Sequence, residues 1–286
     1  MHTLTFGIVT PSFNQGRFIS KAVNSVLAQT GVSLQYIVMD GQSRDETHQV
    51  MSTYGDAVTF VSEPDTGPAN AINKGFARLD VDIYGWLNAD DIYYPDALTT
   101  VAAFFEAHSE VDVVYGGSNH IDEDDAIIEA YPVEDFSFDV LTERCFISQP
   151  AAFFRASTVK RFGPLNETVR GMDYEYWLRL ALGGATFARI PQTLAATRLH
   201  DEAFTVKHRL AVHEEINHFT KKLLGKTPDR WLFNYAHAKV EAMGITRDRH
   251  KVFAAAVGTI SVWTALRMNG RVTKAMLQTI RNWLAG

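Results

Sequence analysis

The sequence of 286 residues predicts an α/β fold, in which helices flank a mostly parallel sheet and a helical C-terminal extension follows. Two patterns lead to this prediction. Over residues 1–200, short apolar segments alternate with amphipathic ones, which is typical of strands joined by crossover helices. After Asp201 the pattern is helical throughout, so we expect two domains, 1–205 and 206–286. The composition, 46% hydrophobic and 21% charged, is that of a folded globular protein.

Apolar runs and the residues that interrupt them define the individual elements. The expected strands cover residues 4–10, 34–39, 57–62, 83–87, 111–115 and 185–190, with a further apolar run at 148–155. The expected helices cover residues 17–29, 68–78, 95–108 and 173–182. Pro11 is expected to end the first strand. Ser43 and Glu46 have the spacing of a capping box, which predicts another helix after them.

The charges are divided unevenly along the chain. Residues 1–200 contain 13 Lys and Arg against 26 Asp and Glu, whereas residues 201–286 contain 14 against 7. An acidic body disfavours nucleic acid as a partner and suits a divalent cation that carries a phosphorylated ligand. The basic tail would suit anionic phosphates or lipid headgroups, or it is simply a solvated helical bundle.

The location of the protein is predicted from two simpler features. Cys145 is the single cysteine, so the chain has no internal disulfide, and a reducing compartment is expected. The first residues lack the basic start and the long apolar stretch of a secretory signal. We therefore expect a cytoplasmic protein.

Polar side chains follow four successive predicted strands. Thr10 to Asn14 follow the first, Asp40 the second, Asp65 the third, and the segment 88–91 (NADD) the fourth. Because ligands of open α/β sheets bind beyond the carboxyl ends of the strands, we expect these side chains to share one edge. The adjacent carboxylates at 90 and 91 require a counter-ion, and hard oxygen ligands favour Mg²⁺ or Mn²⁺. Alternatively, they cap the helix that follows.

Six segments of the chain, in this order, resemble the family 2 glycosyltransferases. They are TPSFN at 10–14, IVMDG at 37–41, SEPDTG at 62–67, AINKG at 71–75, WLNADD at 86–91 and DYEYWLR at 173–179. The resemblance covers about residues 3–205 and does not extend to the basic tail. It implies a nucleotide-sugar-binding GT-A fold with a Rossmann-like sheet, and a reaction that inverts the anomeric centre of the sugar.

The resemblance implies that one group of residues binds the sugar donor. Phe13 matches an aromatic side chain that stacks on the nucleobase, and Pro11 belongs to the loop that lines the base. Asp40 and Asp65 match carboxylates that accept hydrogen bonds from the base and its surroundings. Asn88 replaces the first acid of an Asp-x-Asp element, and we expect it to hydrogen-bond the ribose.

The resemblance also implies a metal site and a catalytic base. Asp90 matches the acid that ligates the Mn²⁺ or Mg²⁺ bridging the two phosphates, and Asp91 is expected to support donor binding. Asp173 matches the base that deprotonates the acceptor hydroxyl as it attacks the sugar. Met172 precedes it where the family often has Glu. On the sequence pattern alone, Asp173 would also suit a helix cap.

Four further residues are candidates for the site. Arg198 and His200 resemble an Arg-x-His segment that follows the last strand in many relatives. This implies that Arg198 pairs with phosphate and that His200 is a further metal ligand, with a surface position as the alternative for His200. Gln149 and Trp177 are candidates for the acceptor pocket, and core packing is the alternative for Trp177.

Two segments of the basic tail bear on membrane binding. Residues 252–266 contain no charged residue, but at 1.5 Å per residue they extend only about 22 Å, less than the roughly 30 Å of a bilayer core. We therefore expect a buried helix there. Residues 271–284 predict an amphipathic helix that lies in a membrane interface. Its expected apolar face consists of Val272, Met276, Ile280 and Trp283.

These observations predict a metal-dependent, inverting glycosyltransferase. Its donor is expected to be a nucleoside diphosphate sugar, with UDP as the expected nucleotide, and its acceptor a hydroxyl of a glycan or of a lipid-linked molecule in cell-surface polysaccharide synthesis. We expect peripheral attachment to the inner face of the cell membrane through anionic lipids. The alternative is a non-catalytic nucleotide-binding or scaffold module of the same fold, which the departures at Asn88 and Met172 favour.

Overall fold

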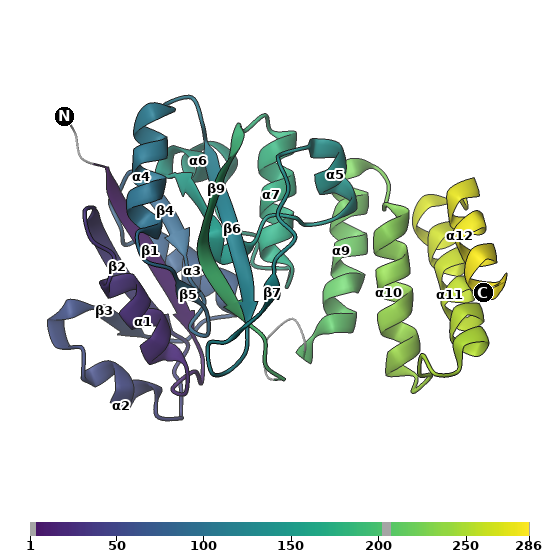
Figure 1. Cartoon of the computed structure of the whole chain (residues 1–286), viewed down its shortest axis with the longest axis horizontal. Coiled ribbons are helices and arrows are strands. Elements are labelled where there is room, and N and C mark those ends of the chain that lie inside the picture. Colours follow the sequence, from purple (N-terminus) through teal and green to yellow (C-terminus); the bar gives the residue numbers. More distant parts are fainter. Residues whose placement is uncertain (1–3, 202–206, 286) are drawn as a thin grey trace. The chain divides into compact units, whose positions relative to one another are not determined.

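A computed structural model describes residues 4–201 and 207–285 of the chain (Figure 1). The chain divides into two compact units. The first comprises the chain up to Phe136 together with Phe146–Glu167 and Arg179–His200. The second comprises Ser137–Cys145, Thr168–Leu178 and the chain from Asp201 onward. The chain passes from the first unit to the second for the last time after His200, and the boundary that we expected is at residue 205. The earlier points at which the chain passes between the units have no signal in the sequence pattern.

The first unit is an α/β structure. Its strands are β1 (Thr5–Ser12), β2 (Ser33–Asp40), β3 (Thr59–Ser62), β4 (Ile83–Trp86), β5 (Ile92–Tyr93), β6 (Val113–Ile121), β7 (Ile127–Ala130), β8 (Ala152–Arg155) and β9 (Phe187–Arg198). Its helices are α1 (Ile19–Leu27), α2 (Thr47–Ser52), α3 (Pro68–Phe76), α4 (Ala97–Ala107) and α6 (Ala156–Phe162), with short 3-10 helices at Gly55–Ala57 and Gln149–Ala151.

All nine of these strands belong to one sheet. Its order is β3-β2-β1-β4-β8-β6-β9-β5, and β7 pairs with β6 (Figure 1). The first four strands in this order are parallel, and β6 and β9 are also parallel, whereas β8 runs antiparallel to both of its neighbours. In register, Ser12 lies opposite Asp40, and Asp40 opposite Ser62. The predicted mostly parallel sheet is confirmed, and the ends of β1, β2 and β3 meet at one edge.

An apolar core between the sheet and its helices holds this edge in place. Phe6 and Ile8 of β1 and Val38 of β2 are fully buried in it. Helix α1 contributes a stripe of buried side chains at helical spacing, among them Ile19 and Val23. Each such side chain stabilises the fold by about 1.5 to 3 kcal/mol relative to an exposed one. The loops that follow the strands therefore begin from well-fixed positions.

The structure corrects two local predictions at this edge. Strand β1 continues through Pro11 to Ser12, in register with β2. Proline is tolerated there because β4 pairs with β1 only as far as Val9, so no strand needs an amide hydrogen from Pro11 on that side. Ser43 does not cap α2, because the helix begins only at Thr47, with Glu46 at its N-cap. The oxygen of Ser43 accepts a hydrogen bond from the amide of Asn14 instead (2.7 Å), and its hydroxyl donates to the carboxylate of Asp40.

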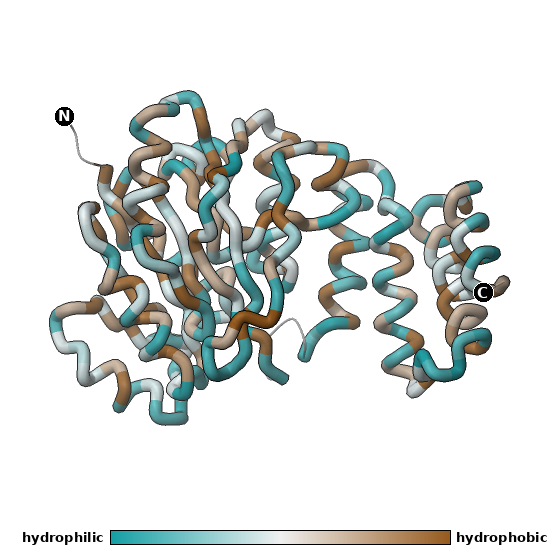
Figure 2. Tube along the Cα trace, viewed as in Figure 1, coloured by the Kyte–Doolittle hydropathy of each residue, from teal (hydrophilic) through white to brown (hydrophobic). Residues whose placement is uncertain are grey.

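The second unit is helical. Its helices are α5 (Phe138–Glu143), α9 (Arg209–Leu224), α10 (Asp229–Ala242), α11 (His250–Asn269) and α12 (Lys274–Ala285), together with the first turns of α7 (Met172–Leu182). Hydrophobic and hydrophilic residues are mixed along each of the long helices α9 to α12, as Figure 2 shows. Helix α11 ends at Gly270, whose positive φ of 68° suits a residue without a Cβ atom.

The apolar face of α12 packs inside this unit, which corrects the prediction of an interfacial helix. Met276 is fully buried against Leu232 of α10 and Ala265 of α11. The partly buried side chains that pack around this cluster and its neighbour include Val272, Ile280 and Trp283. This face is therefore occupied by protein and is not free to contact lipid. Within residues 4–201 and 207–285, no helix combines the length and the apolar character that crossing a bilayer requires.

A partly buried histidine predicts that the stability of the helical unit depends on pH. His213 of α9 is partly buried, with its ring 6.2 Å from that of Trp231. Burial, reinforced by the charge of Arg209, lowers the pKa of His213 from 6.5 to about 4. Between these values the unfolded chain binds a proton that the folded chain does not bind, so stability falls as the pH falls through this window. We expect the free energy of unfolding to decrease by about 1 to 2 kcal/mol from pH 7 to pH 5, measured by urea unfolding.

The variant His213→Phe provides the control, because it keeps an aromatic ring beside Trp231 and removes the titrating group. Its stability should change less between pH 7 and pH 5 than that of the wild type. If the stability of His213→Phe changed with pH as much as that of the wild type, other groups would cause the effect. His237 is one such group, because burial lowers its pKa as well.

Candidate active site

The loops after β1, β2, β3 and β4 leave the sheet at one edge. Main-chain hydrogen bonds extend the ladder beyond the strands, from the amide of Gly41 to the carbonyl of Ser12 (2.8 Å) and from that of Glu63 to the carbonyl of Asp40 (2.9 Å). The amide of Leu87 likewise donates to the carbonyl of Val9 (3.0 Å). The predicted convergence of the four strand ends is therefore present in the first unit.

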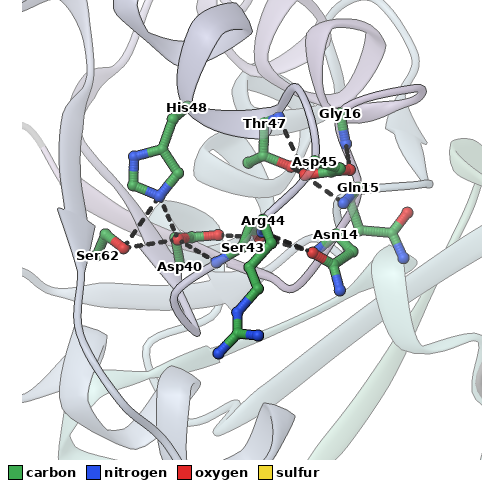
Figure 3. A network of polar contacts seen from close by, with 10 residues as sticks. All are labelled: Asn14, Gln15, Gly16, Asp40, Ser43, Arg44, Asp45, Thr47, His48 and Ser62. Carbon is green, nitrogen blue, oxygen red and sulfur yellow. Dashed lines mark hydrogen bonds and ion pairs between the residues drawn. The ribbon is translucent and has the colours of Figure 1, made fainter.

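Asp40 organises the loop that follows β2 (Figure 3). Its Oδ2 accepts hydrogen bonds from the amide of Ser43 (3.0 Å), the hydroxyl of Ser62 (2.7 Å) and Nε2 of His48 (3.1 Å). Its Oδ1 accepts one from the hydroxyl of Ser43. The side chain is fully buried, so these protein groups already satisfy the carboxylate. The structure thus places Asp40 behind the loop surface, whereas the resemblance implied that it accepts hydrogen bonds from the base and its surroundings.

The loop after β1 is bonded to the loop after β2 (Figure 3). The amide of Asn14 donates to Oγ of Ser43 (2.7 Å), and the amide of Gly16 to Oδ2 of Asp45 (2.9 Å). Burial alone would raise the pKa of Asp45, but hydrogen bonds from Thr47 and Gly16 outweigh it and lower the pKa. An ionised Asp45 therefore ties the two loops together. The serines at 43 and 62 were not predicted as site residues, because single serines near a strand end carry no distinctive signal.

Phe13, Gly41 and Asp65 form an accessible group in front of Asp40. The ring of Phe13 is 62% exposed, which is unusual for a large aromatic side chain at the edge of a sheet. A Cβ atom on Gly41 would lie 2.7 Å from Oδ2 of Asp65 and 3.4 Å from the ring of Phe13. The bare main chain at Gly41 therefore allows the ring and the carboxylate to approach each other. Burial raises the pKa of Asp65, and its Oδ1 accepts a hydrogen bond from the amide of Gly67 (2.8 Å).

Substitution of Gly41 tests this group. In Gly41→Ala the added methyl would displace the carboxylate of Asp65, because a 2.7 Å contact is closer than real Cβ atoms allow. The resemblance implies that Phe13 and Asp65 bind the nucleotide, with UDP expected. On that hypothesis the Kd for UDP should rise about 10-fold with little change in melting temperature, measured by calorimetry and thermal unfolding. Gly171→Ala is the control, since a Cβ on Gly171 would make only ordinary contacts, none closer than 3.5 Å. Equal UDP affinity in Gly41→Ala and the wild type would contradict the role of this group.

Asn88 is held by two hydrogen bonds from its own amide nitrogen. Nδ2 donates to Oδ2 of Asp91 (3.1 Å) and to Oε1 of Gln149 (3.0 Å). Gln149 in turn donates to the main-chain carbonyl of Trp86 (2.7 Å). Asp91 is buried, and its pKa is raised by burial and by the adjacent Asp90. An amide, unlike an ionised acid, can donate to this buried carboxylate, so Asn88 suits its surroundings better than an ionised Asp would.

The variant Asn88→Asp should therefore destabilise the first unit. It would place two carboxylates about 3.1 Å apart and remove the donor to Gln149. We expect a loss of about 1 to 3 kcal/mol in the free energy of unfolding. The comparison with Asn88→Ala, which removes the donor without adding charge, isolates the repulsion. If Asn88→Asp were as stable as the wild type in urea unfolding, this account of position 88 would be wrong.

The guanidinium of Arg198, for which we expected phosphate binding, is buried among acceptors of the protein. Its Nε donates to the carbonyl of Asp90 (2.9 Å), its Nη1 to the carbonyl of Asp122 (2.5 Å), and its Nη2 pairs with Asp125 (2.5 Å). Its main-chain amide donates to Oδ1 of Asp91 (3.0 Å). Strand β9 extends to Arg198, well beyond the expected end at residue 190, and this extension brings Arg198 beside the loop after β4. Asp91, with both oxygens bonded inside the protein, has the same supporting role.

Asp90 and His200 lie beside this support, with side chains that are 16% and 3% exposed. Oδ2 of Asp90 and Nε2 of His200 are 3.0 Å apart, and the His200 ring packs on Phe18 with 4.9 Å between centroids. Two ligands in adjacent octahedral positions, each about 2.1 Å from Mg²⁺ or Mn²⁺, are also about 3.0 Å apart. The donor set of one carboxylate and one imidazole fits such an ion. No group of three or more acidic, His or Cys side chains that suits a metal occurs in residues 4–201 and 207–285, so other ligands would come from water and substrate.

Asp173 belongs to the second unit. It lies in the first turn of α7, where a negative charge favours the helix, and it is partly buried. Burial raises its pKa, although hydrogen bonds from the first amides of the helix lower it in part. A raised pKa makes a carboxylate a better proton acceptor near neutral pH. Trp177, on the same helix, is fully buried, which agrees with the core-packing alternative.

The mixed sheet with its flanking helices has the fold of GT-A glycosyltransferases. Solved structures of this type resemble the chain. S. aureus TarS in complex with UDP-GlcNAc has a TM-score of 0.66 at 14% identity, covering 98% of this chain and 88% of that one. A mannosyltransferase of Pyrobaculum calidifontis in complex with GDP-Man and Mn²⁺ has a TM-score of 0.62 at 18% identity, covering 100% and 84%.

Sequence comparison gives the family. The profile of glycosyl transferase family 2 matches residues 7–161, which is more than half of the chain. An uncharacterized glycosyltransferase of Rickettsia conorii is 28% identical over 195 residues, which are 63% of this chain and 31% of that protein. The chain thus matches about a third of the length of this relative. The chain belongs to glycosyl transferase family 2.

Proposed function

We propose that the protein is an inverting, metal-dependent glycosyltransferase that moves a sugar from a nucleoside diphosphate donor to a hydroxyl of a glycan or of a lipid-linked acceptor. The observation that carries the proposal is the Asp90–His200 pair, 3.0 Å apart, at the sheet edge that also presents Phe13 and Asp65. We propose UDP as the nucleotide and cell-surface polysaccharide synthesis as the setting. Family membership and the UDP-GlcNAc bound to the TarS neighbour support this choice.

Each donor-binding role follows from the chemistry of an available group. The exposed ring of Phe13 stacks on the base, and Asp65 accepts a hydrogen bond from it. Oδ1 of Asn88 accepts from a ribose hydroxyl, since Nδ2 is already engaged. Asp90 and His200 hold a divalent cation, which when bound offsets the negative charge of the leaving diphosphate. Asp40, Asp91 and Arg198 position these groups from behind, and Pro11 forms the end of β1 from which the loop of Phe13 departs.

The chemical step needs one base. We propose that Asp173 accepts the proton of the acceptor hydroxyl while its oxygen bonds to the anomeric carbon. The bond from that carbon to the diphosphate oxygen breaks on the opposite side, so the configuration inverts. The sugar passes through an oxocarbenium-like transition state, as in glycoside hydrolysis. Because protonation below its raised pKa disables Asp173, transfer should weaken in acid.

A screen of nucleotide sugars by thermal unfolding, with and without Mn²⁺, tests the proposed donor class. A ligand that binds the native state at about 100 times its Kd stabilises it by about 2.7 kcal/mol, which is a clear shift in melting temperature. We expect a shift with UDP-sugars that depends on Mn²⁺ or Mg²⁺. Stabilisation by a nucleotide sugar without turnover to any acceptor or to water would favour the non-catalytic module instead.

A further inference from the structure

Helix α11 has an apolar face whose side chains are about half exposed among the residues that the structure describes. Val252 is 56% exposed, and Trp263 and Leu266 are each 52% exposed. Together with the exposed Ala255 and Thr259, these residues form what we call the α11 outer face. The α11 outer face lies on one side of the helix, because its residues follow one another at helical spacing. Thr259 comes seven residues after Val252, Trp263 four residues after Thr259, and Leu266 three residues after Trp263.

The opposite side of α11 is buried. It contributes Phe253, Val257 and Ala265 to the contacts with α10 and α12. The helix was expected to be buried throughout, because residues 252–266 contain no charge. The structure shows instead that half of this uncharged stretch faces outward. A strip of this kind is absent from ordinary solvated helices, whose outer faces carry charged residues.

Two basic side chains and one acidic side chain, Glu214 of α9, lie beside Trp263 on the α11 outer face. Residues 249–285, which include α11 and α12, contain six Lys and Arg and no Asp or Glu. Two cations lie against the exposed indole of Trp263, with Cζ of Arg267 at 5.4 Å and Nζ of Lys239 at 5.8 Å from the ring centroid. An apolar strip with a cationic border complements a surface that is apolar below and anionic above.

We propose that the α11 outer face binds the surface of an anionic lipid bilayer, with the helix lying parallel to it. Trp263 then occupies the headgroup region, which suits an amphipathic ring, and Val252 and Leu266 enter the acyl boundary. Arg267 and Lys239 contact lipid phosphates. A symmetric pairing of this face in two copies of the chain is a poorer alternative, because residues 249–285 of the two copies would bring like charges together without an acid to pair with them.

Sedimentation with lipid vesicles tests this proposal independently of sugar transfer. The wild type should sediment at low salt with vesicles of phosphatidylglycerol and phosphatidylcholine, and should remain in the supernatant with phosphatidylcholine alone. The double variant Trp263→Ser/Leu266→Ser should bind the anionic vesicles at least about 10-fold more weakly. The matched control is Ile127→Ser/Ile128→Ser on β7, whose side chains are 63% and 54% exposed in the first unit. This control should bind like the wild type.

Fluorescence of the wild type gives a second measurement that needs no variant. Trp86 and Trp177 are fully buried, Trp231 is 7% exposed, and Trp283 is partly buried, so Trp263 is the most exposed of the five tryptophans. Brominated phosphatidylglycerol in the vesicles should therefore quench Trp263. Absence of sedimentation and of quenching with anionic vesicles would overturn the proposal. Sedimentation of the double variant with anionic vesicles like the wild type would also overturn it. So would a dimer that the wild type forms without lipid and the double variant does not form, because the face would then bind a second copy of the chain.

Discussion

Replacing Asp173 with Asn is expected to lower the rate of sugar transfer by about 10³-fold while metal-dependent binding of UDP stays within about twofold of the wild type. The amide has nearly the size of the carboxylate but cannot accept the proton of the acceptor hydroxyl. Burial raises the pKa of Asp173, which strengthens it as a base relative to an exposed Asp. Release of UDP in the presence of acceptor measures the rate, and calorimetry measures UDP binding.

A second helix of the same unit provides the control for this variant. Asp139 lies in the first turn of α5, as Asp173 does in α7, but it is exposed. Asp139→Asn should retain full transfer activity, which separates proton transfer from an effect on the helix terminus. If Asp173→Asn transferred sugar at the wild-type rate, Asp173 would be a helix cap and the proposed base would be wrong.

Replacing Asp90 with Asn should remove metal dependence from donor binding. The carboxylate of Asp90 and the imidazole of His200 are the two protein groups that we assign to the cation, so the variant loses the charged one of the pair. We expect the affinity for Mn²⁺ to fall by about 100-fold or more and transfer to fall by a similar factor. Titration of Mn²⁺ in the presence of UDP, followed by calorimetry or by the paramagnetic relaxation of water, measures the affinity.

The neighbouring acid separates metal binding from structural support. Asp91 accepts hydrogen bonds from the Arg198 amide and from Asn88 and is 2% exposed, so Asp91→Asn should lower the melting temperature. Its Mn²⁺ affinity should fall less than that of Asp90→Asn. Equal Mn²⁺ affinity in Asp90→Asn and the wild type would exclude Asp90 as a ligand.

Much of the first unit could be predicted from local patterns. Apolar runs located the strands β1 to β4 to within about two residues, because a strand in a parallel sheet is buried on both faces and must be apolar. The order of the polar segments after these strands led to the GT-A fold, which the sheet topology bears out. Local patterns were less informative for β9, because its second half, which runs to Arg198, mixes polar and apolar residues.

The direction in which each side chain points could not be predicted in the same way. Four acids follow predicted strands, and no local pattern in the sequence distinguishes the buried ones from the accessible ones. They are Asp40, Asp65, Asp90 and Asp91. Asp40 and Asp91 are nevertheless covered, because Ser62 and Arg198, far away in the chain, supply donors to them. Partners of this kind depend on the register of other strands, which single-sequence patterns do not specify.

The sequence by itself determined the class of fold, the edge where polar groups gather and the family, because each depends on short segments whose order is preserved. Only the tertiary structure decided which acids face outward and which apolar faces remain uncovered. Met276 of α12 is buried and Trp263 of α11 is exposed, although both belong to uncharged stretches of one helical unit. The physical reason is that burial of a side chain depends on which element packs against its helix. The packing of the whole unit determines that element, and the sequence of the helix alone does not.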